Sequence, residues 1–319
     1  MKSLTDTIKK KAPWLVPFLM YVKNGTTKTM DKWPIEKLIK ANQRHYKHRM
    51  GYSFDIRKPE LFTEKIQWYK FFYERDDFAQ IVDKVLFKKY VAEKLGPGYT
   101  IPIYGAYKDV KSLEKAWNEI LPDCFVLKAN LQSEGKNIKI VKNKNNIDFS
   151  LIRNELESWL KVENTLMNSC DRNFYTSTPM ILAEEYVSNF ENQLYDYKFF
   201  CFDGQPFCMY VATEHFDRDN TNASIYPIMF YDLNWNKIDL LYGNHPNNAD
   251  VPKPAHFEEM IRISKQLSSG FPFVRVDFFD TDEKLFLAEM TFNPGGGFSP
   301  YKPISFNKLM GDMFKLPLD

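Results

Sequence analysis

The chain has 319 residues, of which 44% are hydrophobic and 16% are aromatic. This aromatic content excludes a disordered chain, and the length suits two or three lobes of the usual domain size, about 100–200 residues each. The four cysteines include no C-x-x-C pair, which excludes a disulfide-stapled scaffold and argues against a zinc site.

The net charge of +2 is unevenly distributed along the chain. Residues 1–50 hold 12 Lys and Arg against three acids, whereas the remainder carries an excess of seven acids. A basic start indicates contact with something anionic, such as the inner membrane face, although a solvated basic helix explains it equally well. Pro13 and Pro17 interrupt the hydrophobic run in this region, and no stretch is long enough to span a bilayer. We therefore expect a cytoplasmic protein, peripheral to the inner membrane face, with no nucleic acid among its partners.

Residues 1–75 are expected to form a basic helical N-terminal segment with a break at Pro34. A later helix in this segment starts near Thr63, whose side chain suits an N-cap. The next helix is predicted from about Asp77 to Leu95, because Gly96-Pro97-Gly98 ends its apolar pattern.

Short β-rich segments then alternate with helices. Strands are expected at Tyr99–Tyr104, Cys124–Ala129, Ile138–Val141, Met180–Glu185, Asp196–Phe202 and Pro206–Ala212, and helices at about 111–120, 149–161 and 254–269. Asp203-Gly204 predicts a tight hairpin, and a last hairpin is formed by Phe271–Phe279 and Lys284–Met290. The mixture predicts an α+β fold with largely antiparallel sheets. After the N-terminal segment, we divide the rest of the chain into a first lobe at residues 76–187 and a second lobe at residues 188–319.

The last hairpin carries two acids that we expect to face each other. Alternation along a strand puts Arg275 and Asp277 on one face, and Glu289 and Thr291 on one face of the returning strand. Facing carboxylates repel each other unless a cation lies between them. Oxygen ligands suit Mg²⁺, which completes its coordination with substrate phosphates. The alternative is an edge hairpin with ordinary exposed acids.

Two other strands carry residues that suit a nucleotide. Lys128 ends a hydrophobic strand, so its ammonium group is expected at the sheet rim, where it can contact phosphate or simply reach solvent. Asp196 and Lys198 open a later strand, where Asp196 suits ribose hydroxyls and Lys198 suits a phosphate or carboxylate. A surface ion pair explains these two residues equally well.

The order of these segments resembles the motif series of ATP-grasp enzymes. The matching segments are Asp83-Lys84, Val126-Leu127-Lys128, Ala183-Glu184-Glu185-Tyr186-Val187, Asp196-Tyr197-Lys198, Arg275-Val276-Asp277-Phe278 and Ala288-Glu289-Met290-Thr291. Three runs, Phe62-Thr63-Glu64-Lys65, the segment 196–204 and Pro294-Gly295-Gly296-Gly297-Phe298, are similar specifically to the TupA-like ATP-grasp family. That family is associated with teichuronopeptide, capsule and exopolysaccharide biosynthesis. The resemblance covers roughly residues 55–315.

The resemblance implies an ATP-grasp fold, in which two α+β lobes clasp ATP, and it implies a role for each matching residue. ATP would be held at its phosphates by Lys84 and Lys128, at adenine by the hinge Glu184, Glu185, Tyr186 and Val187, and at the ribose by Asp196. Arg275 and Lys198 would act in catalysis. Mg²⁺ would be bound by Asp277 and Glu289, with Thr291 and Asn293 beside them. ATP-grasp ligases usually have Asn where Thr291 stands, and the loop at 131–136 is poor in glycine.

The implied activity is that of an ATP-dependent carboxylate–amine ligase, which forms an amide through an acyl phosphate with ATP and Mg²⁺ as cofactors. Its carboxylate partner is expected to be a small molecule or polysaccharide precursor such as a uronic acid, and its amine is unidentified. Two alternatives remain open. One is a phosphotransferase on the same fold, and the other is a catalytically weak binding or scaffold member of a polysaccharide assembly system.

Overall fold

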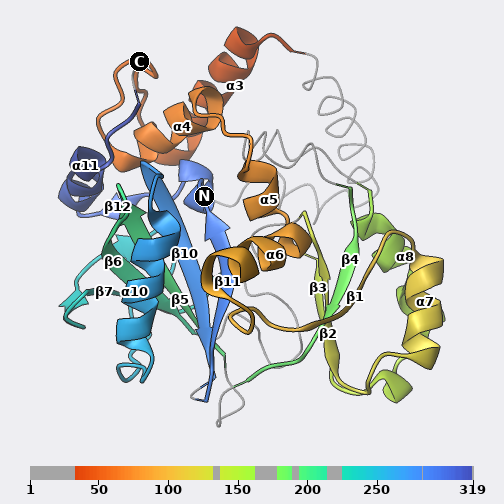
Figure 1. Ribbon diagram of the computed structural model, residues 1–319. Coiled ribbons are helices and arrows are strands. Elements are labelled where there is room, and N and C mark those ends of the chain that lie inside the picture. The colour runs from red at the N-terminus through yellow and green to blue at the C-terminus, as the bar shows by residue number, and fades with distance from the viewer. Residues whose placement is uncertain are drawn as a thin grey trace, which may run out of the picture.

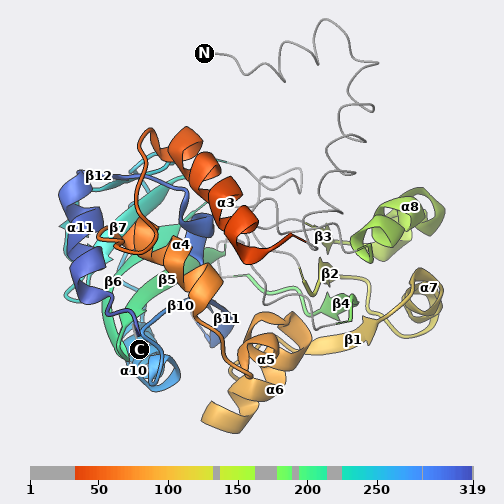
Figure 2. The same cartoon turned by 90° about the horizontal axis from the view of Figure 1, so that it is seen from above.

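The computed structural model describes residues 33–131, 137–161, 178–188, 194–213, 225–281 and 283–317. The basic N-terminal residues 1–32 and the loop residues 132–136 lie outside the described residues. Two larger antiparallel sheets lie side by side and form the two halves of the molecule, as the views from the front and from above both show (Figures 1 and 2). Among the described helices, none is both long and apolar enough to cross a membrane.

The larger sheet has six strands in the order β11-β10-β5-β6-β7-β8. Their bounds are β5 (Tyr195–Phe202), β6 (Gln205–Ala212), β7 (Ile228–Asp232), β8 (Lys237–Ile238), β10 (Phe273–Asp280) and β11 (Leu285–Thr291). Helix α10 (Phe257–Ser268) covers one face, where Phe257 packs on Phe199. The predicted hairpins are present, and Asp203 and Gly204 both have positive φ, as the tight turn between β5 and β6 requires.

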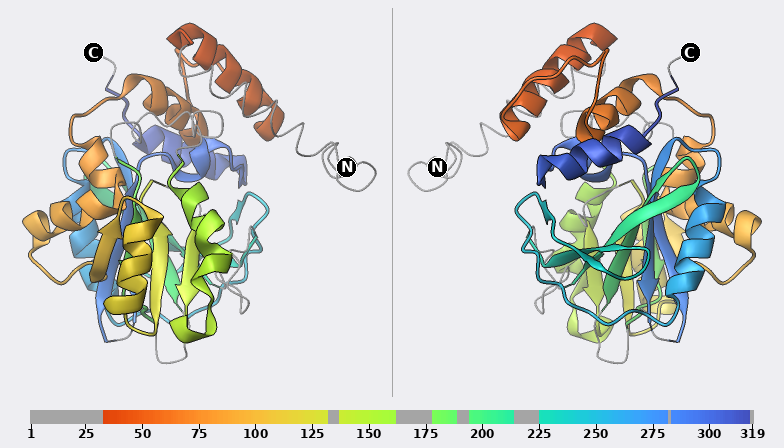
Figure 3. Two further views of the ribbon diagram at one scale, coloured as in Figure 1. Left: turned by 90° about the vertical axis from the view of Figure 1, so that its right-hand side faces the viewer. Right: turned by 90° about the vertical axis from the view of Figure 1, so that its left-hand side faces the viewer.

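The smaller sheet has four strands in the order β1-β4-β2-β3. Their bounds are β1 (Ile103–Tyr107), β2 (Phe125–Ala129), β3 (Ile138–Val141) and β4 (Ile181–Glu184). Helices α7 (Val110–Glu119) and α8 (Phe149–Trp159) cover its outer face (Figure 3), where Trp117 packs edge-on against Phe125. The short helix η1 (Lys144–Asn146) precedes α8. The strand predicted at 99–104 lies about four residues too early, because Gly98 and Pro102 delay the start of β1.

Two helices, α5 (Phe78–Val82) and α6 (Lys84–Leu95), lie between the sheets (Figures 1 and 2). The prediction of one helix from Asp77 to Leu95 is therefore wrong. Asp83 adopts an extended backbone conformation, and its carboxylate accepts hydrogen bonds from the N–H groups of Val85 and Leu86 at 2.8 and 3.2 Å. It is thus the N-cap that starts α6. Both helices contribute buried residues to the same core as the six-stranded sheet.

Helices α3 (Ile35–Met50) and α4 (Phe62–Phe72) lie beside the six-stranded sheet, and Phe62 packs against Phe202 and Phe273 on the face opposite α10. Thr63 is not the N-cap that we predicted. It lies inside α4, because Glu64 instead accepts hydrogen bonds from the N–H groups of Glu60 and Leu61.

The C-terminal elements complete this half of the molecule. Strands β9 (Leu241–Tyr242) and β12 (Tyr301–Lys302) pair with each other, and η3 (Pro294–Gly297) and α11 (Ile304–Met313) flank β12. Helix α11 is held to α4 by two residues of the Phe62–Lys65 run. Thr63 exchanges hydrogen bonds with Asn307, and the Lys65 ammonium donates to the carbonyls of Gly311 and Phe314 at 2.7 and 2.9 Å. This run therefore joins α4 to the end of the chain.

Replacing Lys65 by Met should lower the free energy of unfolding by about 2 kcal/mol, because two charge-assisted hydrogen bonds to the end of α11 are lost. Lys308→Met is the matched control, since Lys308 lies on the surface of α11 and pairs there with Asp312. It should cost less than about 1 kcal/mol. Urea unfolding measures both values, and equal losses would contradict a structural role for Lys65.

Candidate nucleotide and metal site

The first part of the site is a group of charged residues on the three neighbouring strands β5, β10 and β11. Asp277 lies opposite Lys198 on one side and opposite Glu289 on the other. The prediction that residues 277 and 289 face each other is confirmed. On the face of β5 that carries Lys198, the side chain becomes aromatic at Phe202, where Phe62 of α4 packs on it. The charged residues therefore begin beyond the part of the sheet that α4 covers.

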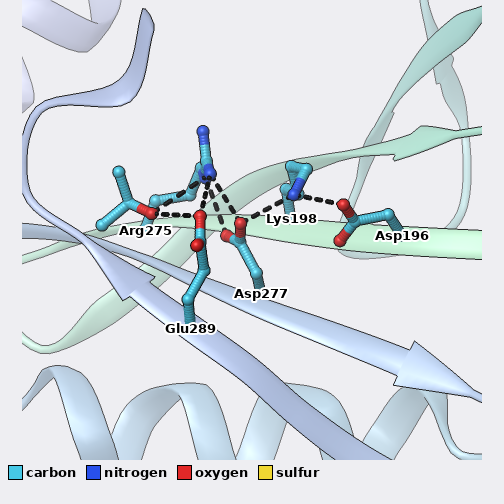
Figure 4. Close-up of polar contacts among 6 residues, drawn as sticks. Asp196, Lys198, Arg275, Asp277 and Glu289 are labelled. Atoms are coloured by element: carbon cyan, nitrogen blue, oxygen red, sulfur yellow. Dashed lines mark hydrogen bonds and ion pairs between the residues drawn. The ribbon is translucent and has the colours of Figure 1, made fainter. Parts of the chain in front are cut away.

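These residues form one continuous network (Figure 4). Arg275 donates two hydrogen bonds to Asp277, from Nε to Oδ1 at 2.7 Å and from Nη2 to Oδ2 at 2.5 Å. Lys198 Nζ lies 2.7 Å from Asp277 Oδ2 and 2.5 Å from Asp196 Oδ2. Arg275 Nη2 also reaches Glu289 Oε1 at 3.1 Å. We call Asp196, Lys198, Arg275, Asp277, Glu289 and Thr291 the Asp277 network.

The cations of the network keep Glu289 ionised, whereas burial raises the pKa of Asp277 despite the opposing charges of Arg275 and Lys198. Burial alone would raise the pKa of Glu289, but Lys198, Arg275 and Lys84 outweigh it and hold the pKa at about 2. Burial would lower the pKa of Lys198, but Asp196 and Asp277 reverse this and raise it. Thr291 donates a hydrogen bond to Glu289 Oε1 at 2.8 Å and accepts one from Arg275. Three acids and two bases leave the network with one net negative charge.

The second part of the site is a cluster of three lysines on the side of the four-stranded sheet. Glu184, at the end of β4, has one oxygen 2.6 Å from Lys128 Nζ and the other 2.8 Å from Lys88 Nζ. Burial would raise the pKa of Glu184, but these two lysines lower it from 4.5 to about 2. Lys84 lies one turn before Lys88 on the same face of α6. We call Lys84, Lys88 and Lys128 the lysine cluster.

The lysine cluster and the Asp277 network lie close to each other. The pKa of Lys84 is lowered, chiefly by burial and also by the charge of Lys128. The charges of Glu289, in the Asp277 network, and of Glu184 oppose this shift. Lys84 therefore experiences charges from both sheets. Lys128 also lies 6.0 Å from the ring centre of Phe279 on β10. The structure thus brings together the predicted residues of the two halves.

Lys84 and Lys128 are fixed relative to each other by a buried side-chain contact. Asn130, just beyond β2, donates a hydrogen bond to Asp83 at 2.8 Å and another to the carbonyl of Thr178. Its own oxygen accepts the N–H of Met180 at 2.8 Å. The cap of α6 is therefore tied to the end of β2, which holds the backbone segments of the two lysines together.

The predicted adenine hinge follows β4. The N–H group of Glu185 donates to the carbonyl of Pro102 at 3.0 Å, and its side chain is exposed. Tyr186 and Val187 are half-buried. Asn293 is buried, lies two residues after Thr291 and the end of β11, and directly precedes η3 with its glycine run.

The glycine run is shaped by α4. Gln67 of α4 donates to the carbonyls of Gly296 and Gly297 at 3.0 Å each, and the Lys70 ammonium also contacts the Gly296 carbonyl. Gly297 has φ of 68°, and a Cβ atom there would lie 2.3 Å from Gln67 Nε2. Both the conformation and the space therefore require glycine at this position.

Sequence reasoning missed Lys88 and Asn130. The signal for Lys88 was its position four residues after Lys84, which puts both on one helix face. Asn130 gave no signal of its own, because its partners Asp83, Thr178 and Met180 are brought to it only by the fold.

Residues 64–315 match the model of the TupA-like ATP-grasp family. This chain belongs to that family. The two antiparallel sheets are accordingly the two lobes of an ATP-grasp fold. A comparison with curated proteins found no match.

Solved structures of other ATP-grasp proteins are distant from this TupA-like chain. D-alanine–D-alanine ligase from Helicobacter pylori is 16% identical, with a TM-score of 0.42, over 73% of this chain and 61% of that one. The corresponding ligase from Bacillus anthracis is 15% identical, with a TM-score of 0.37, over 66% and 57%. D-cycloserine synthetase DcsG is 15% identical, with a TM-score of 0.38, over 74% and 71%. The chain thus spans less than two thirds of the two D-alanine–D-alanine ligases.

The ionised Glu184 should make stability depend on pH. Its pKa is lower in the folded protein than the ordinary 4.5, so its contribution is present above pH 4.5 and is lost as the pH falls towards about 2. Glu184→Gln should therefore be less stable than wild type at neutral pH, by up to about 3 kcal/mol. The difference should shrink in acid. Urea unfolding across this range measures it, and a difference that does not change with pH would rule out the proposed charge pairing.

Proposed function

We propose that this protein is an ATP-dependent carboxylate–amine ligase that works with Mg²⁺. The observation that supports it most is the proximity of a positively charged lysine cluster to a buried carboxylate network at the junction of the lobes of an ATP-grasp chain. Lysines suit the phosphates of a nucleotide, and a pair of acids suits the ion that accompanies them. Neither the lysine cluster nor the carboxylate network stabilises the fold efficiently, because removing charges from water is costly. Their presence is therefore better explained by a function.

The residues present fit Mg²⁺ with a nucleotide. Within the described parts of the chain no three His, Cys, Asp or Glu side chains gather as a metal site. Mg²⁺ does not need such a set, since it is often held by one or two carboxylates and takes its remaining ligands from phosphate and water. Asp277 and Glu289 would supply these carboxylates, and Thr291 and Asn293 would border the ion. When bound, the ion would neutralise charge on the phosphates.

Lys84 and Lys128 would hold the ATP phosphates, and the segment from Glu184 to Val187 would bind adenine through its backbone. The N–H group of Glu185 already donates to the Pro102 carbonyl, so the backbone carbonyl of Glu185 would accept the hydrogen bond from the adenine amino group. Asp196 is assigned to the ribose by its place in the motif series. It is also the partner of Lys198, whose ammonium takes one acceptor position on Asp196 Oδ2.

In the proposed reaction a substrate carboxylate oxygen attacks the γ-phosphorus of ATP, and the bond to the β-phosphate oxygen breaks to release ADP. An amine then attacks the acyl carbon, loses a proton and expels inorganic phosphate. Arg275, held by Asp277 and Glu289, would stabilise the negative charge of the transferring group, and Lys198 would assist it. The other residues position the reactants, as in phosphoryl transfer generally.

The acyl acceptor that we propose is a uronic acid or another acidic precursor of a surface polysaccharide, such as a capsule or exopolysaccharide. The support for this finer assignment is the family to which the chain belongs. The amine is not specified by any residue of the site.

A ligase and a phosphotransferase differ in the fate of the phosphate, so an isotope experiment tests the proposal. A uronic acid labelled with ¹⁸O in its carboxylate should transfer label to inorganic phosphate, because one carboxylate oxygen leaves with the phosphoryl group. Hydroxylamine should trap a hydroxamate when no natural amine is present. If ADP forms while the phosphate stays on the product and no label moves, the phosphotransferase replaces the ligase.

We further propose that the protein works at the inner membrane face, in contact with anionic lipid through its basic N-terminal part. Helix α3 supports this within the described residues. Its buried residues lie on one face, and the opposite face presents Lys37, Lys40, Arg44 and Lys47 to solvent. In the portion of the chain that the structure describes, Lys40, Arg44 and Lys47 form no ion pair. Because the apolar face of α3 is already buried, the contact would be electrostatic.

Replacing Lys40, Arg44 and Lys47 together by Gln should weaken binding to phosphatidylglycerol vesicles roughly 100-fold, at about 1 kcal/mol for each basic residue. Co-sedimentation measures this, and binding should also weaken with salt. The matched control replaces Lys115, Lys237 and Lys308, three exposed lysines that are paired with acids elsewhere on the surface. Equal effects of the two triple variants, or equal binding to neutral vesicles, would contradict the membrane proposal.

A further inference from the structure

Glu184, at the end of β4, is held between two ammonium groups. Its side chain is only 5% exposed, with Oε1 2.8 Å from Lys88 Nζ and Oε2 2.6 Å from Lys128 Nζ. With Lys128 alone, the carboxylate and the ammonium group would neutralise each other, and little attraction for a phosphate would remain. Lys88 changes this balance, because one carboxylate then faces two cations. Together with Lys84, the lysine cluster sets three positive charges against one negative charge.

The Lys88 ammonium is engaged by groups of the protein. It contacts Glu184 and also donates a hydrogen bond to the Ile101 carbonyl at 2.6 Å, so two of its three donors are used. Burial lowers the pKa of Lys88, and the charge of Glu184 opposes this shift. Lys84, by comparison, also experiences the charge of Glu289 across the junction of the lobes. The two lysines therefore differ in their surroundings, although they share one face of α6.

The contact with Ile101 places Lys88 beside the segment that is expected to bind adenine. The next residue, Pro102, accepts the N–H group of Glu185 at 3.0 Å. One ammonium group thus joins α6 to the side chain of Glu184 and to the chain segment that holds the backbone of Glu185. Because Lys84 begins the same helix, Lys88 also links the phosphate-binding end of α6 to the hinge.

We propose that Lys88 is a positioning residue of the nucleotide site, which neutralises Glu184 and thereby leaves the charge of Lys128 available to the phosphates. This inference rests on the proposed function, because it concerns how the same site binds its nucleotide. Glu184 fixes the ammonium group of Lys128 in place, and Lys88 offsets the negative charge that Glu184 brings close to the phosphates. Lys88 does not itself touch the nucleotide, so its effect on ATP binding depends on Glu184.

The experiment measures the affinity of the full chain for β,γ-methylene ATP, a non-hydrolysable analogue, and for adenosine, by calorimetry in the presence of Mg²⁺. The ratio of the two affinities isolates the contribution of the phosphates. Lys88→Met should lower this ratio roughly 10-fold, because the lysine cluster and Glu184 then keep one net positive charge in place of two.

The decisive variant is Lys88→Met/Glu184→Gln, which removes one base and one acid and so returns the net charge to its original value. Its ratio should come back to within about threefold of the wild type, because the amide oxygen of the new glutamine still accepts a hydrogen bond from Lys128. Two controls accompany it. Lys88→Arg keeps a cation at Glu184 and should keep the ratio. Lys89→Met changes an exposed neighbour on α6 that pairs with Glu93, and it should leave the ratio unchanged.

If Lys88 merely supported the fold of the hinge, both affinities would fall together in Lys88→Met, and the unchanged ratio would overturn the inference. A double variant whose ratio stays roughly 10-fold below the wild type would also overturn it, because Lys88 would then contact a phosphate directly. This comparison stands even if Lys88→Met does not fold. A wild type that binds neither ligand would overturn the proposed function, and this inference with it.

Discussion

The buried ion pairs at Asp277 are the constraint on which the rest of the site depends. One carboxylate on β10 receives a lysine from β5 and an arginine from its own strand, and that arginine reaches Glu289 on β11. Three strands are therefore held in one register by charge as well as by backbone hydrogen bonds. Without its two cations, an acid that is inaccessible to water would take up a proton or destabilise the sheet. The negative charge of this network in turn helps to keep Lys84 charged between the two sheets.

Sequence reasoning predicted the local part of the fold and of the site. The alternation of Val274, Arg275, Val276 and Asp277 was sufficient to place Arg275 beside Asp277, and the short turn was sufficient to place Glu289 opposite. It could not show that Lys198 lies on the other side of Asp277, because β5 and β10 are about 80 residues apart in the chain and pair through the order of strands in the sheet. The strands β7, β8, β9 and β12 were missed. The last three have only two residues each, and β9 and β12 are far apart in the chain.

The Phe62–Lys65 run shows that a family signature need not mark chemistry. Phe62 packs on the sheet, Thr63 pairs with Asn307, Glu64 closes the first turn of its own helix, and Lys65 binds the last carbonyls of α11. All four side chains are used in packing or capping. The polar groups of this run satisfy backbone atoms that burial would otherwise leave without partners.

Helix α4 begins upstream of the segment by which the family is recognised, which starts at residue 64. Its first turn needs residues 60 and 61, and Thr63 is held from α3 by the hydroxyl of Tyr46 at 2.9 Å. Asn42, also on α3, donates a hydrogen bond to Gln67, and Gln67 holds the glycine run that follows β11. The boundary of detectable homology therefore cuts through a unit that packs as a whole. A relative that shared the motifs but lacked the preceding helix would have to support the glycine run by other contacts.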